Sequence, residues 1–224
     1  MKAHLAVITV IFLALLAVGV YTKAETPVTP QDFSQYQIWG LWDVFFPSPE
    51  QDPDGNVKNE TMVDLDAASI IARVRFTGLR KPMNYCTLSK VTVVEVIKGD
   101  PALINREISL YEYNFFWSPQ GRPSYSHDRV NLMLDGREYY VFMDKRIQDV
   151  QHIEGLPEYI PVRRMGILPV EITDTDRISM AALFGKNNLT FQEVADCPLL
   201  FGNLEAFSDY EAFYISLVER YMRQ

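Results

Sequence analysis

The feature of this sequence that most restricts its fold is a series of segments in which apolar residues recur at every second position. In SIIARVRFTG, residues 69–78, every second residue from Ile70 to Phe76 is apolar, which predicts a strand with one buried face. In KVTVVEVIKGD, residues 90–100, the apolar phase changes between Val93 and Val94. A change of phase inside a strand predicts a β-bulge, a device that bends a sheet toward a small barrel.

Three later segments extend this β pattern. REISLYEYNFF, residues 106–116, predicts a third strand, and residues 131–145 predict a fourth that is entered through the Asp135-Gly136 turn. A further strand is expected within residues 159–172, where prolines restrict it to the edge of a sheet.

The last 50 residues carry helical signals. Residues 176–184 predict a short helix that ends at Gly185, and Thr190 with Glu193 forms a possible capping box for a second helix. A third helix is expected from Ser208, because aromatic and aliphatic residues then recur at steps of three and four. The predicted fold class is therefore mainly β with α: a small antiparallel barrel followed by C-terminal helices and preceded by an N-terminal apolar helix.

Residues 1–24 have the pattern of a membrane-targeting segment. One lysine precedes an uninterrupted apolar run from Leu5 to Tyr21, and the next charge is Lys23. The run is long for a signal peptide and short for a membrane span, so cleavage near Ala24 and retention as a single-pass anchor both remain open. In either case the amino terminus stays inside and the rest of the chain lies outside, in the cell membrane or secreted.

The exported part is expected to be one domain behind a tether. Residues 25–63 are rich in Pro and Asp and contain an aromatic patch with Trp39, Trp42, Phe45 and Phe46, which we expect to pack against the domain. Residues 64–224 hold the predicted barrel and its helical tail.

The charge balance limits the classes of partner. The formal charge of the chain is −8, and it becomes −10 without residues 1–24, because two lysines and no acid are removed. An acidic domain is unsuited to neutralising phosphates, so no nucleic acid is expected as a partner. Any attachment to the membrane is expected to come from the N-terminal segment.

The barrel segment resembles a pattern found in small exported bacterial proteins. Its pieces are DAASIIARVRFTG, then KVTVVEVIKGD with a basic-Gly-Asp turn, then LMLDGREYYVFM. This order of elements is similar to the oligonucleotide/oligosaccharide-binding (OB) barrel of netrin-like modules and tissue inhibitors of metalloproteinases. The resemblance covers roughly 80 residues and implies a fold. It transfers no functional residue, because those inhibitors use an N-terminal Cys and several disulfides, and this chain has two cysteines.

The sequence carries no recognisable reaction motif. It lacks the G-x-S-x-G elbow of hydrolases and the glycine-rich loops that bind phosphates, so no catalytic residue and no cofactor is predicted. His127, beside Asp128, and His152, near Glu154, are too sparse for a zinc site, and no metal is predicted. Both are expected to be solvated loop histidines.

Cys86 and Cys197 are the two cysteines of the chain. An oxidising exterior permits a disulfide between them, whose long loop would constrain the unfolded chain by roughly 4 to 5 kcal/mol in the chain-entropy model. The alternative is two separate buried thiols, and the sequence leaves both arrangements open.

These observations predict a non-enzymatic module that binds a protein or glycan partner outside the cytoplasm. The candidate contact residues are Phe115, Phe116, Trp117 and Tyr125, because rings supply rigid stacking area; the alternative is that they plug the end of the barrel. Two other functions remain open. One is an envelope hydrolase with carboxylates or a carboxyl–His pair in a cleft, and the other is a protein that acts like a protease inhibitor.

Overall fold

The structure of the protein is a computed structural model. It describes residues 33–38, 50–51, 57–58, 65–83, 85–118, 122–127, 129–147, 152–153, 155–162 and 166–222. Residues 34–224 form one compact unit, and residues 1–33 form another, of which Phe33 alone is described. The predicted targeting segment, the aromatic patch at Trp39, Trp42, Phe45 and Phe46, and most of the predicted tether therefore lie outside the described residues.

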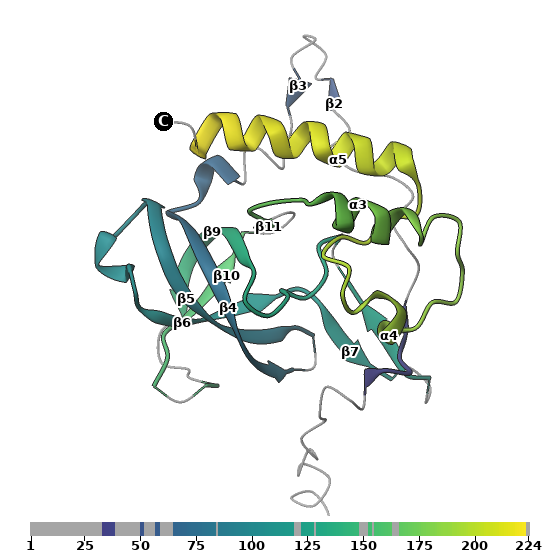
Figure 1. The fold of residues 1–224 in the computed structure, drawn as a ribbon. Coiled ribbons are helices and arrows are strands. Elements are labelled where there is room, and N and C mark those ends of the chain that lie inside the picture. Colours follow the sequence, from purple (N-terminus) through teal and green to yellow (C-terminus); the bar gives the residue numbers. More distant parts are fainter. Residues whose placement is uncertain are drawn as a thin grey trace, which may run out of the picture. The chain divides into compact units, whose positions relative to one another are not determined.

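The described chain is mainly β, and most of its helical residues follow the last strand (Figure 1). The strands are β1 (Gln37–Ile38), β2 (Glu50–Gln51), β3 (Val57–Lys58), β4 (Ile70–Pro82), β5 (Thr87–Lys98), β6 (Glu107–Glu112), β7 (Phe115–Trp117), β8 (Ser124–Ser126), β9 (Glu138–Ile147), β10 (Glu158–Pro161) and β11 (Ile167–Pro169). The helices are η2 (Pro101–Leu103), α3 (Asp174–Ala181), α4 (Phe191–Val194), α5 (Leu204–Leu217) and the π-helical turn η4 (Val218–Met222).

The largest sheet has the strand order β10-β6-β5-β4-β9-β11, and β10 also pairs with β9. The pairing of β10 with β6 is parallel, and the other pairings in this sheet are antiparallel. Alternate residues of these strands, among them Val74, Val91, Ile108 and Val141, are fully buried and form one hydrophobic cluster. The apolar residues that recur at every second position of the sequence thus lie on the face of the sheet that is buried in this core.

The bulge predicted from the change of apolar phase is confirmed. Arg73 pairs with Glu95 and Val74 pairs with Val93, so Val94 has no residue opposite it on β4. β5 therefore advances by two residues where β4 advances by one. Beyond this point the apolar residues of β5 change from odd-numbered to even-numbered positions, and the strand can coil.

The prediction of one strand over residues 106–116 is wrong. The chain breaks after β6 at Tyr113 and Asn114, and β7 pairs with β8 in a second sheet of order β1-β8-β7. Asn114 fixes the break, because its Nδ2 donates to the Val130 carbonyl at 3.0 Å and its own carbonyl accepts from Thr87 Oγ1 at 2.7 Å. A buried side chain that bonds outside the ladder ends the strand.

The predicted strand within residues 159–172 is two strands. β11 lies at the edge of the large sheet, as its proline predicts, but β10 pairs on both sides, with β6 and with β9. The edge prediction is wrong for β10 because Pro161 is its last residue, where the register with β9 shifts. The predicted fourth strand begins later than expected, at Glu138, after a turn in which Gly136 has φ of 70°.

Three helices follow, and their caps account for their starts. α3 begins two residues before the predicted position, because Thr173 and Asp176 form a reciprocal capping box. The capping box of Thr190 and Glu193 is confirmed at α4. The prediction that Ser208 starts the last helix is wrong: α5 begins at Leu204, and Asn203 caps it by accepting from the Ala206 N–H at 2.9 Å.

The predicted apolar stripe of the last helix is confirmed, since Tyr210, Phe213 and Leu217 are buried in a cluster with residues of β9, β11 and α3. Tyr214 Oη donates to the Val170 carbonyl at 2.5 Å, and Figure 1 shows α5 crossing this side of the sheet. Within the described part of the chain, none of the helices combines the length and the apolar character that a membrane span needs.

Candidate functional site

A cluster of polar side chains lies where β6 and β10 run parallel. We call Tyr111, His152 and Glu158 the Glu158 cluster. The Glu158 side chain is completely buried, and its Oε2 accepts from Tyr111 Oη at 2.9 Å and from His152 Nδ1 at 3.1 Å. Its Oε1 accepts from the backbone N–H of His152 and, at 3.4 Å, from that of Ile153. One carboxylate therefore holds both the Tyr111 side chain and the segment that carries His152.

The electrostatics of this cluster follow from burial and from these bonds. Burial opposes ionisation of Glu158, but the hydrogen bonds from His152 and Tyr111 outweigh it and keep the pKa of Glu158 below its usual range. Burial and the bond to Glu158 raise the pKa of Tyr111. At neutral pH Glu158 is thus a carboxylate with its donors in place, and Tyr111 is a neutral donor.

The geometry orients the imidazole of His152. A carboxylate can only accept, so the proton of the neutral ring is assigned to Nδ1, and Nε2 carries a lone pair. Among the described residues nothing forms a hydrogen bond with Nε2, and the side chain is 31% exposed. Lys81 Nζ donates to the His152 carbonyl at 3.0 Å and holds the same residue from the β4 side. The neutral ring therefore presents a fixed acceptor to solvent.

Three aromatic side chains form a second feature, which we call the aromatic row: Tyr85, Phe115 and Trp117. Tyr85 is 77% exposed, and Phe115 and Trp117 are half-buried. The ring centroids of Tyr85 and Phe115 are 5.8 Å apart at 69°, and those of Phe115 and Trp117 are 6.4 Å apart at 57°. It is unusual for an aromatic ring to be as exposed as that of Tyr85, and this ring is in contact with the rest of the row.

The β4–β5 turn connects the two features. Tyr85 contacts Phe115 on one side of this turn. Lys81, just before the turn, donates to the His152 carbonyl at 3.0 Å. The β4–β5 hairpin thus contacts both the aromatic row and the Glu158 cluster.

The structure separates the four predicted contact residues into two pairs. Phe115 and Trp117 belong to the exposed aromatic row. Phe116 points to the other side of β7 and packs on Tyr125 at a centroid distance of 4.9 Å. Tyr125 is completely buried, and its Oη donates to Asn131 Oδ1 at 2.6 Å. Tyr125 is therefore a core residue and offers no surface to a partner in this structure.

Asn131 explains why a tyrosine is accommodated there. Its Oδ1 also accepts from the Leu132 N–H at 2.9 Å, and its Nδ2 donates to the carbonyls of Val194 and Cys197 at 2.8 and 2.9 Å. All the bonding capacity of this buried amide is used, so Tyr125, the end of α4 and Cys197 are held together.

The two cysteines are free thiols in this structure. Cys86 is half-buried beside the Glu158 cluster, and Cys197 is buried with Leu200 and Val194. Burial, and then the charge of Glu158, raise the pKa of the Cys86 thiol. A thiol with a raised pKa is a weak nucleophile at neutral pH.

The expectation that both loop histidines are solvated is wrong. His127 is buried and stacks on Tyr125 at a centroid distance of 6.0 Å. His152 is half-buried, and its acidic partner is Glu158; Glu154 and Asp128 lie outside the described residues. Within the part of the chain that the structure describes, no three His, Cys, Asp or Glu side chains are grouped to hold a metal ion.

Sequence reasoning did not identify Tyr85, Tyr111 or Glu158. Two signals point to them in retrospect. Glu158 is the one acid within the apolar stretch LPEYIP, which is typical of a buried carboxylate with dedicated donors. Tyr85 is an aromatic residue in a tight connection between two strands, where small polar residues are usual.

A second buried carboxylate, Glu112, has a structural role. It accepts from the Met133 N–H at 2.7 Å and from Ser89 Oγ, and Arg80 Nε lies 3.5 Å from Oε1. The cavity beside it, lined by Glu112, Asn114 and Asn131 among others, offers a water-sized space of ≈ 20 Å³. That space holds about one water molecule, so this cavity is too small for a ligand.

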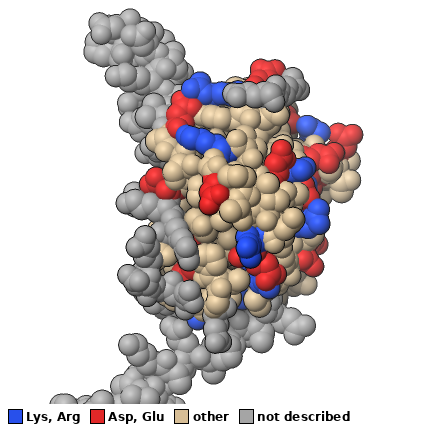
Figure 2. Space-filling view, turned by 90° about the vertical axis from the view of Figure 1, so that its left-hand side faces the viewer, with Lys and Arg blue, Asp and Glu red and all other residues tan. Residues whose placement is uncertain are grey.

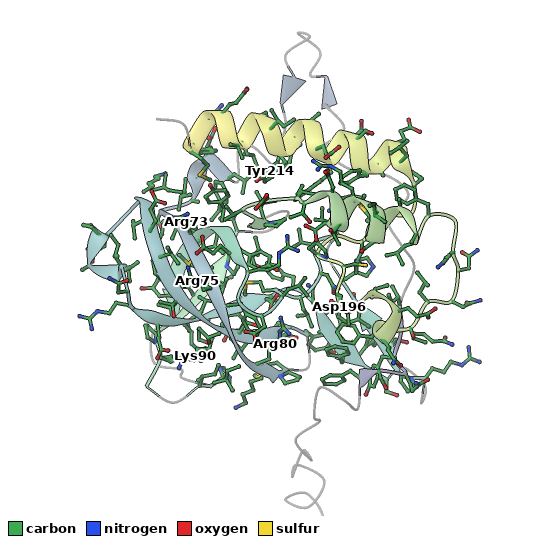
Figure 3. The ribbon with its side chains drawn as sticks, in the orientation of Figure 1. Arg73, Arg75, Arg80, Lys90, Asp196 and Tyr214 are labelled. Carbon is green, nitrogen blue, oxygen red and sulfur yellow. The ribbon has the colours of Figure 1, made fainter. Side chains whose placement is uncertain are left out.

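The basic side chains of β4 are also used within the molecule. Figure 3 shows Arg73, Arg75 and Arg80 in succession along the strand. Arg73 lies 3.2 Å from Glu95 and 3.3 Å from Glu138, and Arg75 lies 2.5 Å from Glu138. On the face in Figure 2, basic and acidic residues are interspersed. These arginines therefore do not form a separate basic patch.

Comparison with known proteins finds no family model and no curated sequence that matches this chain.

Proposed function

We propose that this chain is a non-enzymatic binding module that works outside the cytoplasm and contacts its partner through the aromatic row. The observation that carries the proposal is Tyr85, a ring 77% exposed in a turn and in contact with Phe115. Aromatic side chains supply rigid contact area at a small cost in conformational entropy. Tyr85 lies on the turn of a hairpin whose Lys81 contacts the Glu158 cluster, which offers both stacking and hydrogen-bonding groups to a partner.

The fold that we propose is an OB-type barrel similar to that of netrin-like modules. In its support, β4, β5, β6, β10 and β9 pair in a ring, and β6 and β10 are its parallel pair. OB-type barrels bind ligands on their second and third strands and on the loops after the first and the fourth. Here these are β5, β6, the β4–β5 turn and the connection that carries His152.

The proposed location rests on residues 1–24. In this proposal the segment leads the domain across the membrane and either stays as an anchor or is removed near Ala24. Fractionation of the producing cells, with the amino terminus identified by mass spectrometry, tests it. We expect the domain in the membrane or in the medium and sensitive to added protease in intact cells; a protease-protected cytoplasmic pool contradicts it.

The contact surface is tested with a photo-reactive benzoylphenylalanine in place of Tyr85 in the full chain. This group inserts into C–H bonds of sugars and proteins alike, so the mass of the adduct reports the partner. The matched control carries it in place of Ile178 on α3, which is 71% exposed. Exposure of both variants to native envelope should give an adduct at position 85 and none at 178. Equal labelling at both positions, or none at either, contradicts the proposal.

A hydrolase is the second candidate, and the contact between Glu158 and His152 is the observation that favours it. In that case His152 Nε2 would act as a general base on water, since Glu158 orients the ring through Nδ1. Peptidoglycan and oligosaccharides incubated with the full chain distinguish the two functions. Intact substrates support a binding module, and products that disappear with His152→Asn identify the hydrolase.

A further inference from the structure

We infer that the ligand of the aromatic row is a carbohydrate, which stacks on Tyr85 and Phe115 and gives a hydroxyl hydrogen bond to Nε2 of His152. This inference rests on the proposed function, and it selects one of the two partner classes that the sequence leaves open.

The aromatic row fits a small ligand with apolar faces and polar edges. Tyr85 and Phe115 meet at 69°, so the two rings form a step and not a single flat wall. A pyranose ring matches such a step, because its C–H face stacks on an aromatic ring while its hydroxyl groups project sideways. None of the three rings carries a charge, so the surface does not require an ionic ligand.

His152 provides the hydrogen bond that a sugar hydroxyl needs. Its ring is fixed by the 3.1 Å contact between Nδ1 and Glu158 Oε2, and its backbone is held by Glu158 and by Lys81. The lone pair of Nε2 therefore has a defined direction before the ligand arrives, which lowers the entropy lost on binding. A hydroxyl group donates to this acceptor, whereas the carboxylate behind it is buried and already occupied.

The β4–β5 hairpin contacts both recognition elements. Tyr85 in the turn touches Phe115, and Lys81, four residues earlier on β4, donates to the His152 carbonyl at 3.0 Å. In this inference one ligand lies along the hairpin and contacts both the rings and the imidazole.

A protein partner fits this surface less well. A stable protein interface needs about 800 Å² on each side, with an apolar centre. The exposed aliphatic residues of the described chain are dispersed over β4, the η2 region, α3 and α5: Leu79, Ile104, Ile178, Leu204 and Ile215. They do not gather around the aromatic row.

The test measures binding of the full chain to an array of neutral and acidic oligosaccharides, followed by calorimetry on the best of them. Tyr85→Ala should weaken binding on the order of tenfold, the equivalent of one stacking contact, whereas Tyr85→Phe should retain it. His152→Asn keeps a donor for Glu158 and removes Nε2, so it should weaken binding by about fivefold or more. His152→Gln, whose amide oxygen reaches the Nε2 position, should restore part of it. Ile178→Ala is the matched surface control and should bind normally.

Each result decides between the inference and the proposed function. Saccharide binding that depends on Tyr85 and on His152 supports both. A protein adduct at position 85 without saccharide binding overturns the carbohydrate inference and leaves the binding module intact. Saccharide binding that none of these variants changes, while urea unfolding shows all of them folded, overturns the assignment of the site. No adduct and no saccharide binding overturn both.

Discussion

The two sides of β7 teach how one short strand serves two purposes. Phe116 packs on Tyr125, Tyr36 and Phe191 in the cluster behind the strand. Phe115 and Trp117 contact each other, and Phe115 also contacts Tyr85, which is largely exposed. Because side chains alternate along a strand, the same run of three aromatic residues anchors the second sheet and supplies part of the proposed contact surface. The aromatic composition of the strand does not distinguish these two roles. The alternation of side chains between the two faces of the strand does.

The largest effect on stability is expected when a ring on the buried side of β7 is removed. Tyr125→Ala deletes a completely buried ring and leaves Asn131 without one of its donors. We expect a loss of about 3–5 kcal/mol in the free energy of unfolding. Urea denaturation followed by circular dichroism measures it. A loss below about 1 kcal/mol would place Tyr125 outside the core.

A smaller change isolates the polar part of the buried side. Tyr125→Phe keeps the ring and removes the hydroxyl that donates to Asn131 Oδ1. The expected loss is about 1 kcal/mol, since Asn131 Oδ1 keeps its bond from Leu132. The same unfolding experiment applies. A loss as large as that of Tyr125→Ala would mean that the hydrogen bond, and not packing, holds this cluster.

The Glu158 cluster predicts a dependence on pH. The pKa of Glu158 is lower in the folded state than its ordinary value of 4.5, so its contribution to stability is complete above that value. The contribution is lost as the pH falls through the folded-state pKa. Unfolding free energies from pH 7 to pH 3 should therefore fall less steeply in Glu158→Gln than in the native chain. Identical slopes would contradict an ionised, hydrogen-bonded Glu158.

The smallest effect is expected on the exposed side. Tyr85→Ala removes a ring that is 77% exposed, so the free energy of unfolding should change by no more than about 0.5 kcal/mol. Differential scanning calorimetry beside Tyr125→Ala measures the contrast. A destabilisation comparable to that of Tyr125→Ala would show that Tyr85 supports the fold and would remove the basis of the contact surface.

The sequence predicts local features here better than it predicts pairings. The bulge at Val94 and the cap at Thr190 are both visible in the sequence, because each follows from the chemistry of neighbouring residues. The break at Asn114 depends on contacts with Thr87 and Val130, which are distant in sequence.

The candidate site follows the same rule. Phe115 and Trp117 are found from composition, whereas the burial of Tyr125 is set by packing against α4 and by Asn131. Glu158 and Tyr111 come together through the parallel pairing of β6 and β10, which hydrophobic spacing does not reveal. Long-range pairing is thus the information that local patterns lack.

Hydroxyl-radical footprinting of the full chain, alone and with native envelope, tests the central claim most directly. The account predicts that Tyr85 is oxidised rapidly in the free protein and is protected by the envelope, while Tyr125 is oxidised slowly in both samples. Rapid oxidation of Tyr125 in the free protein, or the same oxidation of Tyr85 with and without envelope, would contradict it.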